Sequence, residues 1–413
     1  MRVLILTHFS RGDIQPFAAL AKTLRECGHE VVIGAPGTSR ELLRPYSTAV
    51  IGFEDRDRNI SRQPAVRRLY GKGVPFQFIP PARRELAGML EDFATALDSE
   101  PDLVVHHAGL PGHQIAESLG VPAIPVCLHP SYVPTDSFAN PYFPVRVPPA
   151  LNRATYSWTS LYLRTLFPSM GRWRRDRLGM PRRRGHRNAL RRPDGRPVKV
   201  LQAFSRYALP TPLNYPESVF TGGYWLLPLS EGWSPPDQLT AFLDSGDPPV
   251  YIGFGSMALN DPRRLGRIVA AAVRRAGVRA IVVGGWGAID PAELGAGTLY
   301  LPEAPLDWLF PRTAAVVHHG GNGTIGYALA AGRPQVVCPF MAFDQLFYAR
   351  QLHTRGVAPP PRPHRGLTAD GLASAMSMAV TDARMAERAA DIGRRVRHED
   401  GVNAAVGILE SLV

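Results

Sequence analysis

The chain has 413 residues, 45% of them hydrophobic, and a formal net charge of +12 at pH 7. This length exceeds one ordinary core, so we expect two domains of roughly 200 residues each. No run approaches the roughly 20 apolar residues that cross a bilayer, and the apolar run at 1–7 is too short for a signal peptide, which predicts a cytoplasmic protein without membrane-spanning segments.

The first part of the chain alternates between strand and helix patterns. Val3 to Thr7 reads as a buried strand, a helix with apolar residues at helical spacing follows until Gly28, and Val31 to Ile33 is the next strand. Further strands are expected at 101–107 and 121–126, with a helix around 114–119 between them. This order predicts the start of a doubly wound α/β sheet.

The middle of the chain, from 138 to 196, is rich in proline and arginine, and we interpret it as a mobile insertion. Nine of its arginines lie between 174 and 192. Such a run either forms a solvated loop or binds an anionic lipid surface or a nucleic acid. No nucleic-acid-binding motif accompanies them, so we exclude that partner. An apolar and aromatic stretch precedes the arginines, and weak contact of 156–196 with a membrane surface is therefore a second possibility beside the solvated loop.

The second half of the chain predicts another sheet of the same kind. A segment rich in turn-forming residues, 210–236, is the expected crossing between the domains. Strands are expected at 250–254, 280–283, 298–301, 315–318 and 335–338, separated by helices such as 262–276. We place the N-terminal domain at 1–215, the second domain at 216–390 and a helical end at 391–413.

A glycine-rich turn follows the strand that ends near His318. His319, Gly320 and Gly321 lead into a helix that begins near Asn322. Free N–H groups at a helix start attract anions, and glycines let the backbone approach phosphate oxygens closely, so this turn indicates a phosphate cradle. The alternative is a turn kept only for tight packing.

The three segments 304–311, 318–324 and 339–345 follow one another in an order that resembles the donor-binding signature of the inverting nucleotide-sugar glycosyltransferases of family 1, which have the GT-B fold. The segments 221–225 and 249–257 are similar to the sterol and lipid glucosyltransferase branch of that family, and 10–16 is similar to the same loop in sterol and antibiotic glycosyltransferases. The resemblance implies two Rossmann-like domains that face each other across a cleft, with the last helix, within 391–413, crossing back to the first domain. Most of 35–215 carries no recognisable motif.

The resemblance also implies which residues bind the donor, a UDP- or dTDP-sugar. Diphosphate contacts are expected from the glycine turn with Ser256 beside it, sugar contacts from an acid–amide pair, and contacts to the base from Trp286 and the backbone at Leu301. The complete donor set is Ser10, Gly12, Ser256, Trp286, Leu301, His319, Gly321, Asn322, Gly323, Thr324, Asp344 and Gln345. Donors at the cradle would stabilise the leaving diphosphate, so no metal is expected.

Asp13 is the candidate general base, because it lies in the loop after the first strand, where the resemblance implies a cleft. The alternative is that Asp13 is only the N-cap of a helix that starts at Ile14. His106 and His107 end another strand directed at the same cleft and are candidates for contact with the acceptor or for assisting Asp13. Buried structural histidines are an equally good interpretation of this pair.

Metal and disulfide chemistry find little support in the sequence. No cluster of His, Cys and acidic residues has metal-ligand spacing, and Asp55-Arg56-Asp57 reads as a solvated loop. The three cysteines, Cys27, Cys127 and Cys338, are far apart and suit reduced thiols packed as small apolar groups.

The resulting hypothesis is a metal-independent inverting O-glycosyltransferase, acting as a monomer or homodimer. Its acceptor would be a lipophilic small molecule, either a sterol or lipid or a polyketide, macrolide or peptide antibiotic. The alternative is a non-catalytic accessory or binding protein that kept the fold. An oxidoreductase is excluded because the turn at 7–16 lacks the dinucleotide-binding glycines.

Overall fold

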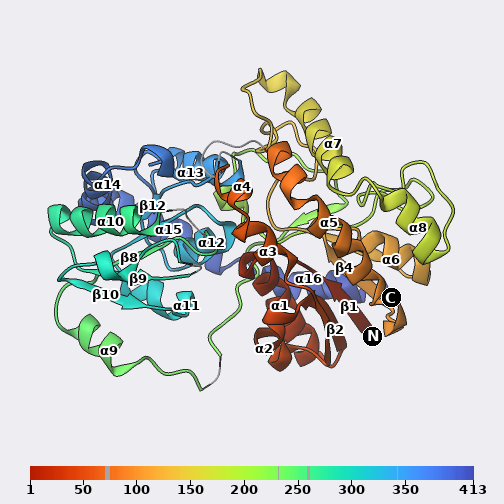
Figure 1. Cartoon of the computed structure of the whole chain (residues 1–413), viewed down its shortest axis with the longest axis horizontal. Coiled ribbons are helices and arrows are strands. Elements are labelled where there is room, and N and C mark those ends of the chain that lie inside the picture. Colours follow the sequence, from red (N-terminus) through yellow and green to blue (C-terminus); the bar gives the residue numbers. More distant parts are fainter. Residues whose placement is uncertain (70–74, 231, 258–260, 286, 342) are drawn as a thin grey trace.

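The computed structural model of the chain describes residues 1–69, 75–230, 232–257, 261–285, 287–341 and 343–413. Two parallel β-sheets lie side by side, each with helices packed against it (Figure 1). Hydrophobic clusters cover both faces of each sheet. The predicted fold class, two Rossmann-like doubly wound units, is confirmed.

The first sheet has seven strands in the order β3-β2-β1-β4-β5-β6-β7. The strands are β1 Arg2–Leu6, β2 Glu30–Pro36, β3 Ala49–Phe53, β4 Leu103–His107, β5 Ala123–Cys127, β6 Val200–Gln202 and β7 Val219–Thr221. The helices of this part are α1 Arg11–Glu26, α2 Arg40–Leu43, α3 Arg56–Arg62, α4 Pro64–Arg67, α5 Ile79–Ala94, α6 Gly112–Leu119, α7 Ser157–Leu166 and α8 Met170–Leu178. Because β7 belongs to this sheet, the chain leaves it only after Thr221.

The second sheet has five strands in the order β10-β9-β8-β11-β12. The strands are β8 Val250–Gly253, β9 Ala280–Val283, β10 Thr298–Leu301, β11 Ala315–His318 and β12 Gln335–Val337. The helices after the first sheet are α9 Asp237–Asp244, α10 Pro262–Ala276, α11 Leu306–Leu309, α12 Asn322–Ala330, α13 Asp344–Thr354, α14 Ala369–Thr381, α15 Ala383–Arg397 and α16 Gly401–Glu410. Among the described residues, no helix is both long and apolar enough to cross a bilayer.

Local sequence signals explain where α10 begins and ends. The Asp261 side chain accepts a hydrogen bond from the backbone N–H of Arg264 at 2.8 Å, and Pro262 occupies the first helical position, where no N–H is needed. Gly277 ends the helix at φ +63°, a left-handed conformation that glycine adopts without strain. The helix predicted from the sequence, 262–276, matches these bounds.

A separate apolar cluster joins the two halves of the chain. Phe138 and Phe204 from the first half pack there with Ile325 of α12 and Tyr348 of α13. The chain end adds a second connection, because α15 packs on α12 and α16 returns to pack on α1. Trp225 fixes this return by donating its Nε1–H to the carbonyl of Gly401 at 3.2 Å. Both halves are therefore held by apolar packing close to the cleft.

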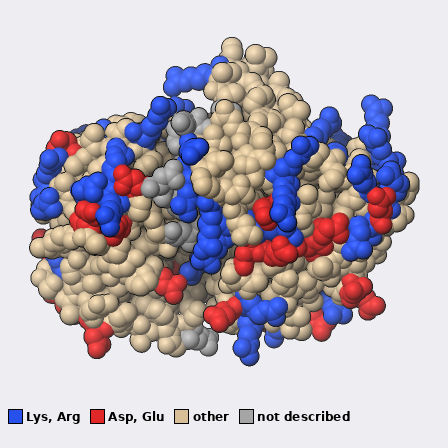
Figure 2. Space-filling model, in the orientation of Figure 1, with Lys and Arg blue, Asp and Glu red and all other residues tan. Residues whose placement is uncertain are grey.

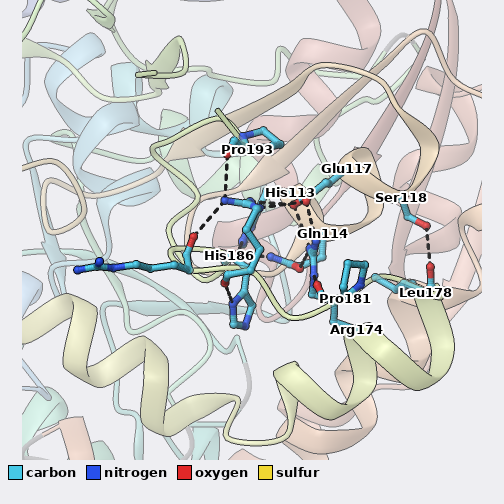
Figure 3. Close-up of polar contacts among 11 residues, drawn as sticks. His113, Gln114, Glu117, Ser118, Arg174, Leu178, Pro181, His186 and Pro193 are labelled. Carbon is cyan, nitrogen blue, oxygen red and sulfur yellow. Dashed lines mark hydrogen bonds and ion pairs between the residues drawn. The ribbon is translucent and has the colours of Figure 1, made fainter. Parts of the chain in front are cut away.

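The arginine-rich segment after α7 is built into the first half (Figure 3). Arg174 is almost fully buried and binds Glu117 through both guanidinium nitrogens, at 2.6 and 3.0 Å, while Arg183 reaches the same carboxylate at 3.0 Å. Burial disfavours the charged form of Glu117, but the two arginines outweigh it and lower its pKa to about 2. The prediction of an insertion outside the core is therefore wrong for α8, residues 170–178, whose apolar side chains join the core of the first half, whereas most of 179–196 is exposed. The physical reason for this difference is the carboxylate of Glu117, which pairs with two of the arginines. The arginine-rich run does not itself contain this partner.

The cysteine prediction holds for two of the three side chains. Cys127 and Cys338 are buried free thiols, whereas Cys27 is an exposed free thiol just after α1. Burial raises the pKa of both buried thiols. They are therefore unreactive packing groups.

Candidate active site

Asp13 lies in the first turn of α1, which begins at Arg11 and has Ser10 as its N-cap. Its Oδ2 accepts hydrogen bonds from the backbone N–H of Ser10 at 3.1 Å and from the Ser10 hydroxyl at 2.8 Å. The alternative reading of Asp13 as an N-cap before Ile14 is therefore wrong, since Ser10 caps the helix and Asp13 closes the capping box from its third position. The exposed Gly12 lies beside the Ser10 hydroxyl.

The environment of Asp13 favours a basic carboxylate. Burial raises the pKa of Asp13 to about 6, although the hydrogen bonds from Ser10 act in the opposite direction. Its negative charge also raises the pKa of Asp344 in the second half, which places the two carboxylates within electrostatic range across the cleft. A carboxylate with a pKa near 6 is ionised at pH 7 and still takes up a proton readily.

His106 and His107 point to opposite faces of the first sheet, as consecutive strand residues do. His106 donates its Nδ1–H to the carbonyl of His107 at 2.9 Å and stacks near His113 of α6, on the side away from the cleft. His107 accepts a hydrogen bond on Nδ1 from Gly109 at 3.1 Å and packs against Phe9. Burial lowers the pKa of His106 to about 4 and that of His107 to about 3, so both rings are neutral at pH 7.

Of this pair, only His107 lies on the side of the Asp13 loop. Register pairing of Leu6 with His106 brings the loop after β1 next to the loop after β4, and Phe9 of the former loop contacts the His107 ring at 6.1 Å between centroids. The Nε2 atom of His107 is buried and has no hydrogen-bond partner among the described residues. Because Gly109 donates to its Nδ1, His107 carries a free Nε2–H near Phe9 of the loop before Asp13; His106 also leaves its Nε2 without a partner among the described residues, but that nitrogen is an acceptor because Nδ1 carries the proton.

The glycine turn after β11 places His319 against the turn after β8. His318 is satisfied on both ring nitrogens, by the N–H of Gly320 at 3.0 Å and by Gln335 at 2.9 Å. His319 is buried, neutral because burial lowers its pKa to about 4, and without a partner for Nδ1 among the described residues. A Cβ on Gly321 would lie 2.5 Å from His319, so the ring requires a glycine there.

Ser256, Gly323 and Thr324 are partly exposed around this turn. Ser256 follows Gly255, whose φ of +55° and close approach to His319 fix the turn after β8. Gly323 and Thr324 lie in the first turn of α12, where backbone N–H groups are free of helical partners. The turn, the ring and the helix start together form the arrangement that an anion prefers.

Asn322 has an unexpected partner. Its side-chain amide donates to the backbone carbonyl of Leu128, which follows β5 in the other half. Its Oδ1 is buried without a partner among the described residues. Asn322 therefore connects the start of α12 to the first sheet, and its remaining acceptor points to a contact outside the protein.

Asp344 and Gln345 are the first two residues of α13, and their side chains differ in their interactions. The Gln345 carbonyl oxygen accepts from the backbone N–H groups of Phe340 and Met341 at 2.9 and 3.0 Å, so it fixes the loop after β12 and leaves its amide N–H groups for other partners. Burial and the charge of Asp13 raise the pKa of Asp344 to about 6. Asp344 forms no ion pair among the described residues.

The structure describes one of the two residues that we expect to contact the nucleotide base. Leu301 ends β10 with a buried side chain, and its carbonyl accepts a hydrogen bond from Gly284 at 3.0 Å. Trp286 lies outside the described residues. The Leu301 backbone therefore stands at the carboxyl end of the second sheet, the edge at which ligands of such sheets bind.

Sequence reasoning missed Asp57 by interpreting it as a solvated loop. It lies in α3, forms no ion pair among the described residues, and burial together with the charge of Asp13 raises its pKa to about 7. With Phe9, Arg11 and Glu303 it lines a pocket of about 440 Å³. Nothing in the local sequence indicates this position, because it depends on the packing of α3 on α5, which brings Asp57 to the same pocket as Arg11 and Ile14 of α1.

The cleft contains a carboxylate, a neutral imidazole and the free N–H groups of a helix start. In the described part of the chain, no group of three or more His, Cys, Asp or Glu side chains is arranged to hold a metal ion. A hydroxyl near Asp13 can lose its proton to the carboxylate, and negative charge that develops near His319 meets N–H donors of the helix start.

Comparisons with known proteins find relatives of both halves of the chain. Residues 3–131 match the glycosyltransferase family 28 N-terminal domain, and residues 297–403 match the erythromycin biosynthesis protein CIII-like C-terminal domain. The O-mycaminosyltylonolide 6-deoxyallosyltransferase of Streptomyces fradiae is 35% identical over 99% of this chain and 97% of its own length. The sterol 3-beta-glucosyltransferase of Neosartorya fischeri is 31% identical over 98% of this chain, which spans only 29% of that relative.

Solved structures share the fold across the whole chain. The glycosyltransferase SnogD of Streptomyces nogalater has a TM-score of 0.69 at 21% identity and is covered completely, as is this chain. The glycosyltransferase VinC in complex with dTDP has a TM-score of 0.67 at 17% identity over 100% of this chain and 99% of its own. The fold of this chain is therefore that of GT-B glycosyltransferases.

Proposed function

Because the chain belongs to the family 1-like glycosyltransferases, we propose that it transfers a sugar from a UDP- or dTDP-sugar to a hydroxyl of a lipophilic small molecule, with inversion at the anomeric carbon. The observation that carries this proposal is that α1, whose first turn contains Asp13, packs on α12, which begins at the His319 turn, with Gln15 donating to the Tyr327 hydroxyl at 2.9 Å. A binding protein without activity would have no need to keep a basic carboxylate opposite an anion cradle.

In the proposed mechanism Asp13 is the general base. The acceptor hydroxyl gives its proton to the Asp13 carboxylate as its oxygen attacks the anomeric carbon, and the bond from that carbon to the diphosphate oxygen breaks on the opposite face. Ser10 holds Asp13 in place through its two hydrogen bonds. His107, with its free Nε2–H, is placed to orient the acceptor hydroxyl.

The leaving diphosphate is stabilised by neutral donors in this proposal. His319 and the free N–H groups at the start of α12 meet the charge that develops on the diphosphate, with Ser256, Gly321 and Thr324 around it. Asp344 and the amide N–H groups of Gln345 bind hydroxyls of the sugar and align the anomeric carbon for attack. The nucleotide base of the donor would contact the Leu301 backbone and Trp286.

Two classes of acceptor remain, and the comparisons favour one of them. The Streptomyces fradiae relative is matched over nearly its full length, whereas the fungal sterol glucosyltransferase is matched over less than a third of its length. We therefore place a polyketide, macrolide or similar natural product first and a sterol or lipid second. The protein would act in the cytoplasm as a monomer or homodimer.

A panel of nucleotide sugars tests the proposal directly. Purified protein is incubated with UDP- and dTDP-sugars and with macrolide, aromatic polyketide and sterol acceptors, and release of UDP or dTDP is measured with and without EDTA. We expect product with at least one pair and equal rates in the presence of chelator. Activity lost with EDTA and restored by magnesium would contradict metal independence, and binding of a nucleotide diphosphate without any turnover would favour the accessory role.

A further inference from the structure

The segment 141–166, which we name the apolar lobe, projects from the first half of the molecule and includes α7 (Figure 1). Three large apolar side chains are exposed on it: Val145 at 60%, Leu151 at 51% and Leu161 at 49%. The part 144–151 between them is exposed along almost its whole length. Exposed apolar side chains that gather on one projection mark a contact surface.

The charges of the apolar lobe all have one sign. It contains no Asp or Glu and three exposed arginines, Arg146, Arg153 and Arg164, of which Arg153 forms a solvent-exposed ion pair at 3.7 Å with Asp136, just before the lobe. Figure 2 shows the top of this projection free of charged side chains, with Lys or Arg beside it. An apolar tip with cationic residues around it is complementary to an anionic lipid surface, in which headgroups bind the cations and acyl chains receive the tip.

Among the described residues of 141–196, the large exposed apolar side chains all lie in the apolar lobe. Phe167, Met170 and Trp173, which the sequence offered as an apolar edge, are buried against the first sheet. Arg174 and Arg183 are engaged by Glu117. The large exposed apolar side chains therefore lie not in the arginine-rich run but on the projection that precedes it.

We propose that the apolar lobe docks on an anionic membrane surface. A second copy of the chain fits it less well, since a stable dimer buries roughly 800 Å² on each partner over a complementary face, whereas the apolar lobe is a convex projection with repelling like charges. A bilayer needs no complementary shape and accepts a projection of this kind.

Aromatic rings connect the apolar lobe to the candidate base. Trp158 of α7 contacts Phe76 at 4.8 Å between centroids, and Phe76 contacts Tyr162 at 5.5 Å. Tyr162 contacts Tyr142 at 6.0 Å. From Tyr142 the sequence of rings continues through His129, at 5.2 Å, to His107, at 6.4 Å from His129.

This ring path gives docking a purpose that rests on the proposed function. A lipophilic acceptor held in the bilayer would approach the cleft on the side where this chain of rings ends at His107, with less exposure to water than an acceptor that arrives through bulk solvent. Docking itself needs neither donor nor acceptor, so it can be tested apart from transfer.

Vesicle sedimentation of the full-length protein tests the docking. Vesicles of phosphatidylcholine alone and with 30 mol% phosphatidylglycerol, about a third anionic lipid as a cytoplasmic-type surface, are pelleted with protein and no substrate. We expect binding to the anionic vesicles, weakened by salt, and at least about tenfold weaker binding for Val145→Glu/Leu151→Glu/Leu161→Glu, which places charge where apolar groups would enter the bilayer.

The matched control is Met378→Glu/Val380→Glu, because these α14 side chains are each 39% exposed and lie far from the apolar lobe in the chain. It should bind vesicles like the unmodified protein. A second variant, Arg146→Gln/Arg153→Gln/Arg164→Gln, keeps the apolar tip and should lose the preference for anionic vesicles. Both lobe variants should keep their melting temperature, since all substituted side chains are exposed.

Equal vesicle binding by the Glu variant and the unmodified protein, or no binding by either, would overturn the proposal. A concentration-dependent dimer that only the Glu variant loses, seen by light scattering without lipid, would overturn it in favour of a second copy. Failure of sugar transfer with vesicle binding intact would instead count against the proposed function and leave docking standing.

Discussion

Strands β4 and β11 each lie beside the first strand of their sheet, and a pair of histidines marks the end of each: β4 ends on both, whereas β11 ends on His318 and His319 follows it. In both pairs the first ring is held by the protein: His106 by the His107 carbonyl, and His318 by Gln335 and Gly320. In both pairs the second ring keeps a buried nitrogen without a partner among the described residues. Two equivalent positions thus offer a neutral imidazole.

The residues that follow each histidine pair give the ends of β4 and β11 different surroundings. After His319 come two glycines and the free N–H groups of α12, so that end suits a diphosphate. After His107 the chain reaches α6 only at Gly112, whose first turn carries His113 and packs over His106 on the far side of the sheet. The ring of His107 is instead contacted by Phe9, in the loop that leads to Asp13. In the proposed function, the same dipeptide would serve an anion in one half and support a base in the other.

The largest expected effect tests the base assigned to the first half. Asp13→Asn keeps the size of the side chain and an acceptor for Ser10 but removes the proton acceptor, so turnover should fall by about 10²–10⁴-fold. Affinity for nucleotide diphosphate, measured by calorimetry, should stay within about twofold because its cradle lies in the other half. Retained turnover with a lower melting temperature would assign Asp13 to capping alone.

The next effect tests the anion end. His319→Ala removes a neutral donor from the leaving group and should reduce kcat/KM by roughly 2–4 kcal/mol, about 30- to 900-fold, with little change in acceptor KM. The matched control is His318→Gln, one residue earlier, which should cost stability rather than transition-state stabilisation because its ring only holds Gly320 and Gln335. Equal kinetic losses in both variants would contradict the division within the pair.

A pH profile separates the aspartate from the histidines. Asp13 with a pKa near 6 must be ionised to act, so kcat/KM should fall about tenfold for each pH unit below 6 and level off above it. The histidines, with pKa values of about 3 and 4, stay neutral over this range. The acid limb should be absent from the residual activity of Asp13→Asn, and its persistence there would point to another group, with Asp57 the first to examine.

The raised pKa of Asp13 also predicts a pH dependence of stability, and its direction is opposite to that of activity, because stability decreases as the pH rises. A folded-state pKa above the ordinary value of 3.8 means that the folded protein binds the proton more tightly than the unfolded chain. The contribution of Asp13 to stability is therefore full below pH 3.8 and is lost as the pH rises through 6. At pH 7.5 the melting temperature of Asp13→Asn should equal or exceed that of the unmodified protein.

The smallest effect tests the supporting histidine. His107→Ala removes one neutral hydrogen-bond donor and should raise acceptor KM by about 2- to 10-fold, the usual value of 0.5–1.5 kcal/mol, with kcat nearly unchanged. His107→Gln should restore part of the loss, because its amide can donate. A hundredfold fall in kcat with His107→Ala would instead make His107 the base.

The sequence by itself determined the features that depend on neighbours a few residues away. The periodicity of 262–276, with Asp261 before it and Gly277 after it, specifies α10, and the strand followed by glycines specifies the anion end near His319. Caps, turns and side-chain periods act over one or two turns of chain, so the local sequence contains all that they need.

Only the tertiary structure decided which distant groups meet. Glu117 pairs with Arg174, 57 residues away, which turned an expected solvated insertion into part of the first half. Asn322 reaches Leu128 across 194 residues, and Asp57 gains its raised pKa from a helix that only packing brings near Asp13. Burial and charge pairing depend on the whole arrangement of the chain, because a side chain meets a low dielectric or a partner only after the elements around it have packed.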